Sequence, residues 1–149
     1  MKPSFPLRIG SALSLLYFAG HMSGIPWTPS TGPETAALLT TMKSYRFDVV
    51  GSSRTYWDFY LGFGLTIGVY LLVQTVALWH LGTMSNRDAR SVRPLLAVFG
   101  LGLVANAILL WRFFFAIPLV LTIAIAICLA LAFVATRTNG DERPGVAQR

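Results

Sequence analysis

The stretch that decides the fold class is residues 94–135, PLLAVFGLGLVANAILLWRFFFAIPLVLTIAIAICLALAFVA, in which Arg112 is the only charged residue. One straight helix of this length would be about 63 Å long, roughly twice the thickness of a bilayer's hydrocarbon core. The stretch must therefore fold back on itself. Arg112 and Pro118 are its main interruptions, and we place a turn at Arg112, between two membrane spans.

The rest of the chain has the same character, since 54% of its residues are hydrophobic and only 12% are charged. Soluble domains hold about twice that share of charge. Two further apolar blocks complete four predicted spans, at residues 7–25, 57–81, 94–111 and 113–135. The predicted fold is all-α, an integral membrane four-helix bundle with one domain at 1–135 and a polar, flexible cytoplasmic tail at 136–149. We expect the first block to be a retained span, because it is long for a signal peptide and lacks an A-x-A-like cleavage site.

The segment between the first two spans is polar and rich in proline, and it forms a long first extracytoplasmic loop. Within it, residues 34–45 are predicted to be a short helix. Pro33 suits a first helical turn, and Glu34 suits the positive end of the helix dipole. The helix is too short and too polar to cross a membrane, so we expect it to lie at the membrane surface or over the bundle.

The orientation follows from the lysine and arginine residues of the short connections. With both termini in the cytoplasm, the inner side holds Lys2, Arg8, Arg87, Arg90, Arg93, Arg137, Arg143 and Arg149, and the outer side holds Lys43, Arg46, Arg54 and Arg112. The excess of positive residues inside favours this topology and a bacterial inner membrane. The net charge of +6 then suits anionic lipid at the cytoplasmic face. No nucleic-acid partner is expected, because the basic residues are dispersed among loops.

The chain lacks the residues that several kinds of metal, haem and catalytic site require. Cys128 is the only cysteine, so the chain forms no internal disulfide and has no thiolate zinc site. His21 and His80 are the only histidines, and the predicted topology places them at opposite membrane faces, which excludes a bis-histidine haem within one leaflet. Phosphate-binding and hydrolase motifs are absent from the sequence. We therefore expect neither a metal nor a cofactor.

Four polar side chains are predicted to lie in the outer leaflet. Placing a polar group in the membrane costs free energy, so the positions of these side chains are informative about function. His21 lies near the outer end of the first span, and Asp58 lies at the outer start of the second. Asn106 precedes the outer end of the third span, and Arg112 lies on the turn into the fourth. Residues from separate parts of the chain thus converge on one region.

The spacing of neighbouring small and polar residues supports this convergence. Stripes at helical spacing are formed by Gly10, Ser14, Tyr17 and His21, by Arg54, Asp58 and Gly62, and by Gly102 and Asn106. Such stripes pack against neighbouring helices in lipid. Gly64 and Gly68 form a G-x-x-x-G pair on another side of the second span, suited to a second helix neighbour or to a contact in a homo-oligomer or larger membrane complex. Gln74 faces away from Asp58, and we expect it to form an interhelical hydrogen bond.

Two interpretations of the polar residues remain open. In the first, Asp58 pairs with Arg54 or Arg112 and merely fixes the helix register. In the second, the polar residues and the surrounding aromatic rings line a pocket open to the outside. The candidate ligand-binding residues are His21, Arg54, Tyr56, Trp57, Asp58, Asn106 and Arg112. If the site is catalytic, Asp58 and His21 are the candidate acid and base.

The strings FDVVGSSRTYWDFYLGFG at 47–64 and LWRFFFAIP at 110–118 resemble an uncharacterised family of small bacterial four-span membrane proteins. The layout also loosely resembles DoxX-type proteins and sterol-isomerase-like folds. The resemblance implies a four-helix inner-membrane bundle and no particular substrate.

The leading functional hypothesis is binding of a small amphipathic or lipid-like ligand. One alternative is an accessory or assembly subunit of a larger membrane complex. The other is a lipid-directed isomerase or hydrolase that uses Asp58 and His21.

Overall fold

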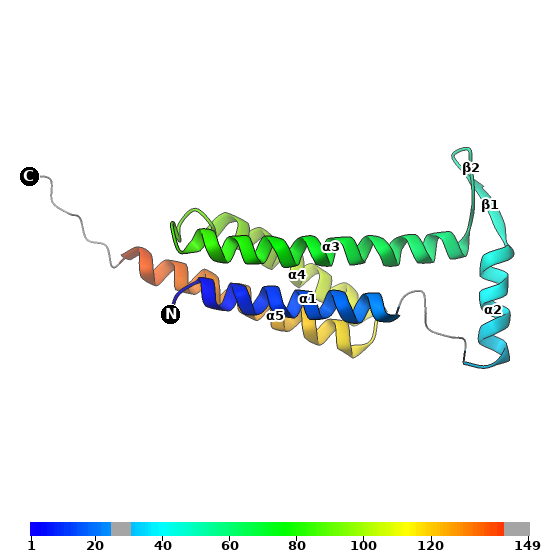
Figure 1. The fold of residues 1–149 in the computed structure, drawn as a ribbon, viewed down its shortest axis with the longest axis horizontal. Helices are drawn as coiled ribbons and strands as arrows, with labels where there is room; N and C mark the ends of the chain where they lie inside the picture. The colour runs from blue at the N-terminus through cyan, green and yellow to red at the C-terminus, as the bar shows by residue number, and fades with distance from the viewer. Residues whose placement is uncertain (25–30, 142–149) are drawn as a thin grey trace, which may run out of the picture. The chain divides into compact units, whose positions relative to one another are not determined.

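Five helices and one β-hairpin make up the computed structural model, which describes residues 1–24 and 31–141, and side chains up to residue 137. In chain order the elements are α1 (Ser4–Gly24), α2 (Pro33–Ser44), β1 (Arg46–Val49), β2 (Ser52–Thr55), α3 (Tyr56–Ser85), α4 (Arg93–Phe113) and α5 (Ala116–Asp141) (Figure 1). The fold is therefore predominantly helical, as predicted. Residues 25–30 and 142–149, which hold the predicted end of the first span and most of the predicted tail, lie outside the described residues.

Three of the helices are long and apolar enough to cross a membrane: α3, α4 and the Ala116–Arg137 part of α5. They cover the second, third and fourth predicted spans, and they support the assignment to a membrane. Helix α1 covers the first predicted span with 21 residues, but it is less apolar than the other three. Its crossing of the membrane stays a prediction.

The apolar stretch that decides the fold forms a helical hairpin of α4 and α5 (Figure 1). The break falls at Phe114 and Phe115, later than expected, and Arg112 lies in the last turn of α4 rather than on the connection. Pro118 explains the position of the break. Inside a continuous helix its ring would clash with the carbonyl of Phe114, whereas in the first turn of α5 its missing N–H costs nothing.

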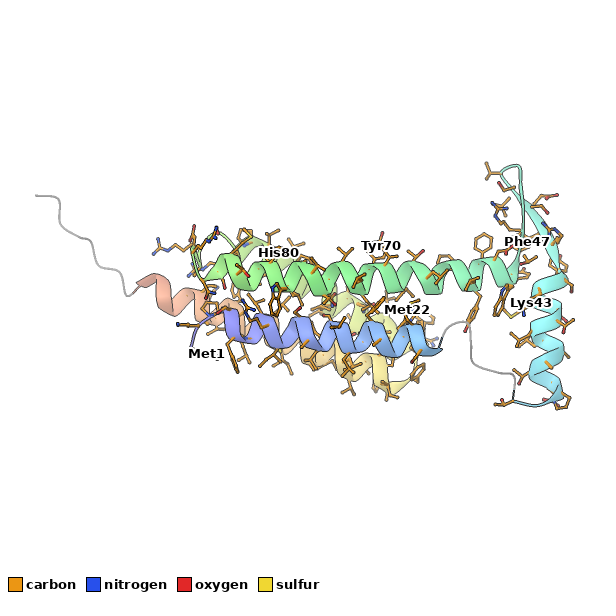
Figure 2. The ribbon with its side chains drawn as sticks, in the orientation of Figure 1. Met1, Met22, Lys43, Phe47, Tyr70 and His80 are labelled. Carbon is orange, nitrogen blue, oxygen red and sulfur yellow. The ribbon has the colours of Figure 1, made fainter. Side chains whose placement is uncertain are left out.

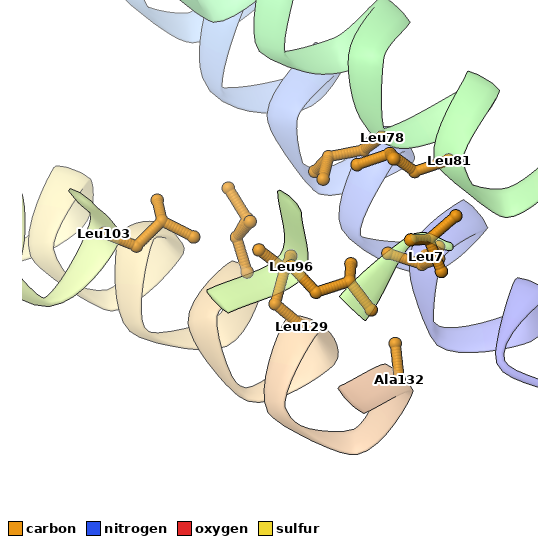
Figure 3. Packing of buried hydrophobic residues seen from close by; sticks show 9 residues of the cluster. Leu7, Leu78, Leu81, Leu96, Leu103, Leu129 and Ala132 are labelled. Atoms are coloured by element: carbon orange, nitrogen blue, oxygen red, sulfur yellow. The ribbon is translucent and has the colours of Figure 1, made fainter. Parts of the chain in front are cut away.

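The chain divides into two compact units, residues 1–17 with 72–149 and residues 18–71. The first unit has an apolar core (Figure 3). Its members are Leu7, Leu78, Leu81, Val92, Leu96, Leu103, Ile125, Leu129 and Ala132. They come from four helices and from the connection between α3 and α4, so burial of these side chains holds the first unit together.

Small and polar residues bring α1 close to its neighbours in the first unit. Ser11 Oγ donates a hydrogen bond to the carbonyl oxygen of Thr75 at 2.8 Å, and Gln74 Nε2 donates one to Ser14 Oγ at 2.9 Å. The interhelical role predicted for Gln74 is thus confirmed. A Cβ on Gly10 would lie 3.4 Å from the Cβ of Cys128, which shows how closely α1 approaches α5.

The C-terminal helix extends beyond residue 135, where the last span was predicted to end. Thr136 is fully buried, and Arg93 donates hydrogen bonds to both its hydroxyl and its carbonyl oxygen. Helix α5 continues to Asp141. Helix α5 therefore continues beyond the predicted end of the last span, and an arginine at the start of α4 anchors it at Thr136.

The second unit contains α2, the β-hairpin, the end of α1 and the first half of α3. Helix α2 occupies the region where a short helix was predicted at 34–45; its location outside the membrane stays a prediction. The hairpin was not predicted. Its strands pair antiparallel, with Arg46 opposite Thr55 and Val49 opposite Ser52. The turn places both Val50 (φ 48°) and Gly51 (φ 77°) in the left-handed region, as in a type I′ turn.

Candidate functional site

The start of α3 is closed by a reciprocal pair of hydrogen bonds between Thr55 and Asp58. The Asp58 N–H donates to Thr55 Oγ1 at 3.1 Å, and the Thr55 N–H donates to Asp58 Oδ2 at 2.8 Å. This arrangement is a capping box, which satisfies backbone donors that have no acceptor within the helix. Asp58 therefore has a structural role at the helix terminus, and Thr55 is its partner.

The capping box uses only one of the two carboxylate oxygens of Asp58. Its side chain is exposed, and its Oδ1 atom accepts no hydrogen bond from the part of the chain that the structure describes. The predicted partner Arg54 donates to the carbonyl oxygen of Ser53 at 2.9 Å. Arg54 is exposed as well. Both charged groups can therefore meet a bound molecule.

Arg54 and Asp58 lie along a shallow, open groove of about 300 Å³ on one face of α3. The groove is lined by Arg54, Asp58, Phe59, Gly62, Phe63 and Thr66. No atom of the described residues lies within 4 Å of the position where a Cβ on Gly62 would be, so the face is open at this glycine. The predicted stripe of Arg54, Asp58 and Gly62 is thus one side of a groove, and the two phenylalanines supply its apolar part.

Aromatic rings cluster between the hairpin and the start of α3. Tyr45 and Tyr56 stack with ring centroids 5.7 Å apart, and Phe47 lies 4.9 Å from Tyr56 and 5.6 Å from Phe59. Phe59 in turn lies 6.0 Å from Phe63. Of these residues, Phe47 is labelled in Figure 2. The rings connect the hairpin to the aromatic wall of the groove.

Trp57 belongs to a separate group of side chains on the same unit. The ammonium group of Lys43 lies 4.7 Å from the centroid of the Trp57 ring, and the Tyr60 ring lies 5.5 Å from it. The first of these is a cation–π contact between α2 and α3. Trp57 therefore helps to position α2, while Tyr56 belongs to the cluster next to the groove.

His21 and Met22 pack against the glycine pair of α3 within the second unit. His21 Nε2 lies 2.7 Å from the carbonyl oxygen of Gly64, which can only accept, so Nε2 carries the proton. A Cβ on Gly68 would lie 2.6 Å from the sulfur of Met22, a side chain labelled in Figure 2. The Gly64–Gly68 face therefore has α1 of the same chain as its neighbour.

His21 and Asp58 have different partners. Gly64 lies about 9 Å further along the α3 axis than Asp58. Within residues 1–24 and 31–137, no hydrogen bond joins the two side chains. The pairing of Asp58 with His21 as acid and base stays a hypothesis.

Asn106 and Arg112 lie on α4, in the first unit. The Asn106 side chain is exposed, and the Arg112 guanidinium lies 5.4 Å from the centroid of the Phe113 ring. Their grouping with Asp58 stays a prediction.

Among the described residues, no three His, Cys, Asp or Glu side chains are placed to hold a metal ion. Comparison of the chain with protein-family models, curated proteins and solved structures gives no match. The geometry of the groove is therefore the feature that bears on function.

Two features of this region had signals in the sequence that were missed. Thr55 followed three residues later by Asp58 matches the capping-box pattern, and it directly precedes an apolar run. Phe59 and Phe63 are one helical turn apart and flank Gly62, so their spacing could have assigned them to the walls of the groove.

Proposed function

We propose that this protein binds a small amphipathic or lipid-like molecule in the α3 groove. The observation that carries the proposal is the composition of the groove, which has Arg54 and Asp58 at one end and two phenylalanine rings beside an open glycine. Binding sites of this kind combine an apolar body with a few polar anchors. The ligand's polar head would lie at the charged end and its apolar part over Gly62.

The two anchors favour a head group that both donates and accepts hydrogen bonds. Arg54 supplies only donors, and the unused Oδ1 atom of Asp58 supplies an acceptor. A zwitterionic head, or one with several hydroxyl groups, satisfies both. The hydroxyl group of Thr66 gives a further polar contact on the groove.

We further propose that the chain is a four-span protein of the bacterial inner membrane, with both termini in the cytoplasm. In this topology α1 is the fourth span beside α3, α4 and α5. The distribution of lysine and arginine supports the orientation. The groove then lies at the outer end of α3, where aromatic rings are favoured at the membrane surface.

Substitution of Gly62 by leucine tests the groove. Because the space next to Gly62 is empty, we expect G62L to fold normally while it fills the groove and lowers the ligand's affinity about tenfold or more. Native mass spectrometry of the gently extracted protein measures the bound molecule. Gly102 on α4 likewise has no atom of the described part of the chain within 4 Å of a Cβ, so G102L is the matched control.

Asp58→Asn tests the polar end separately. The asparagine carbonyl can still accept the Thr55 N–H, so the cap and the melting temperature should be retained while the charge is lost. We expect weaker ligand binding in D58N. Unchanged ligand occupancy in both G62L and D58N would exclude the groove as the binding site.

A further inference from the structure

A second pocket lies in the first unit, where α1 begins and α3 ends. It has a volume of about 420 Å³ and is lined by Lys2, Pro3, Ser4, Ser85 and Asn86. A Cβ on Gly82 would lie 3.5 Å from the carbonyl oxygen of Ser4, so the two helices meet directly beside the pocket. The pocket shares no residue with the α3 groove, and the proposed function does not use it.

The first turn of α1 presents donors without acceptors. Ser4 is 8% exposed, and its hydroxyl group and N–H have no hydrogen-bond partner in the described part of the chain. Pro3 and Pro6 have no N–H, and the Phe5 N–H donates to the carbonyl oxygen of Lys2. Ser4 is thus more than nine-tenths buried in the wall of the pocket, and its unused hydroxyl is available to a molecule bound there.

The other polar groups of the pocket also favour an acceptor as ligand. Lys2 has an ammonium group with three donors, and Asn86 has an exposed amide. The Ser85 hydroxyl already donates to the carbonyl oxygen of Gly82 at 2.9 Å. Among the described residues, no carboxylate lines the pocket.

The surrounding charge is positive. Near the ends of the helices at this side of the first unit, the described side chains include six cations, Lys2, Arg8, Arg87, Arg90, Arg93 and Arg137. The described side chains of this region also include the carboxylate of Asp88. Its Oδ1 atom already accepts hydrogen bonds from the N–H groups of Arg90 and Ser91. The positive end of the α1 dipole adds to the attraction for an anion.

We infer that this pocket binds the phosphate group of an anionic phospholipid, with Ser4, Asn86 and Lys2 as donors. Phosphate offers several strong acceptors, which match the unused donors, and its charge matches the surroundings. A lipid is the favoured source, because α3 is long and apolar enough to cross a membrane and ends at the pocket. The surplus of basic residues here fits the anionic cytoplasmic leaflet.

The test uses substitutions that leave the net charge unchanged. The full chain in mild detergent is titrated with phosphatidylglycerol, phosphatidylcholine or inorganic phosphate, and binding is measured by native mass spectrometry. We expect N86A and S4A each to lower the affinity for phosphatidylglycerol roughly tenfold, as expected for loss of a hydrogen bond to a charged group. Thr83 is exposed, lies near the end of α3 and does not line the pocket, so T83A should bind normally.

A second pair of variants distinguishes binding in the pocket from diffuse electrostatic attraction to the basic surface. K2Q and R87Q remove the same charge, but only Lys2 lines the pocket. We expect K2Q to lower the affinity more than R87Q. Normal binding by N86A and S4A, with equal losses in K2Q and R87Q, would overturn the inference in favour of diffuse electrostatic attraction. Binding of inorganic phosphate without preference for phosphatidylglycerol would overturn the assignment to a lipid.

Discussion

The two units are stabilised in different ways. In the first unit, leucine side chains from separate helices form a buried core, and serine and glutamine side chains bond between helices. In the second unit, α2 has no buried residue, and Thr55, Gly64 and Gly68 are among the few buried positions. Local hydrogen bonds and ring contacts therefore define the second unit, and many of its aromatic side chains lie on the surface.

The largest expected effect tests the core of the first unit. Leu78 is fully buried, whereas Leu72, on the same helix, is 43% exposed. We expect L78A to lower the free energy of unfolding in mild detergent by about 2–5 kcal/mol, because it leaves a cavity among packed helices. L72A removes the same atoms from a surface position and should have a much smaller effect. Equal losses in the two variants would contradict the proposed role of burial.

A smaller effect is expected at the start of α3, where the second unit depends on a local cap. T55A removes one half of the capping box and should cost about 1 kcal/mol of unfolding free energy. R54A should cost only about 0.5 kcal/mol or less, because Arg54 and Asp58 are both exposed and solvent screens the attraction between their charges. A larger loss in R54A than in T55A would show that the charge of Arg54, and not the cap, holds Asp58.

The smallest effect is expected at the hairpin turn. Val50 is fully exposed and has a φ of 48°, a conformation that is unfavourable for a β-branched residue. Asparagine adopts this conformation more easily, so V50N should stabilise the hairpin by about 1 kcal/mol. Slower hydrogen exchange of the β1 and β2 amides would report the gain. Unchanged or faster exchange would show that Val50 is not strained.

Part of the α3 groove was predictable from the spacing of residues. Arg54, Asp58 and Gly62 follow each other at intervals of one helical turn, so the sequence places them on one face. The role of Asp58 as a helix cap depends on where α3 begins, and the span was predicted to start at residue 57. The pocket at the other end of α3 was not predictable, because Ser4 and Asn86 are far apart in the chain and meet only through helix packing.

The sequence by itself determined the membrane character, the helical hairpin of α4 and α5, and the interhelical role of Gln74. These follow from apolar length and helical spacing, which are local properties of the chain. Only the tertiary structure showed that α1 covers the Gly64–Gly68 face, that Arg93 anchors α5 at Thr136, and that Ser4 lines a pocket with Asn86. Each of these contacts joins residues from different helices, and side-chain packing between helices selects one neighbour among several that the sequence pattern allows.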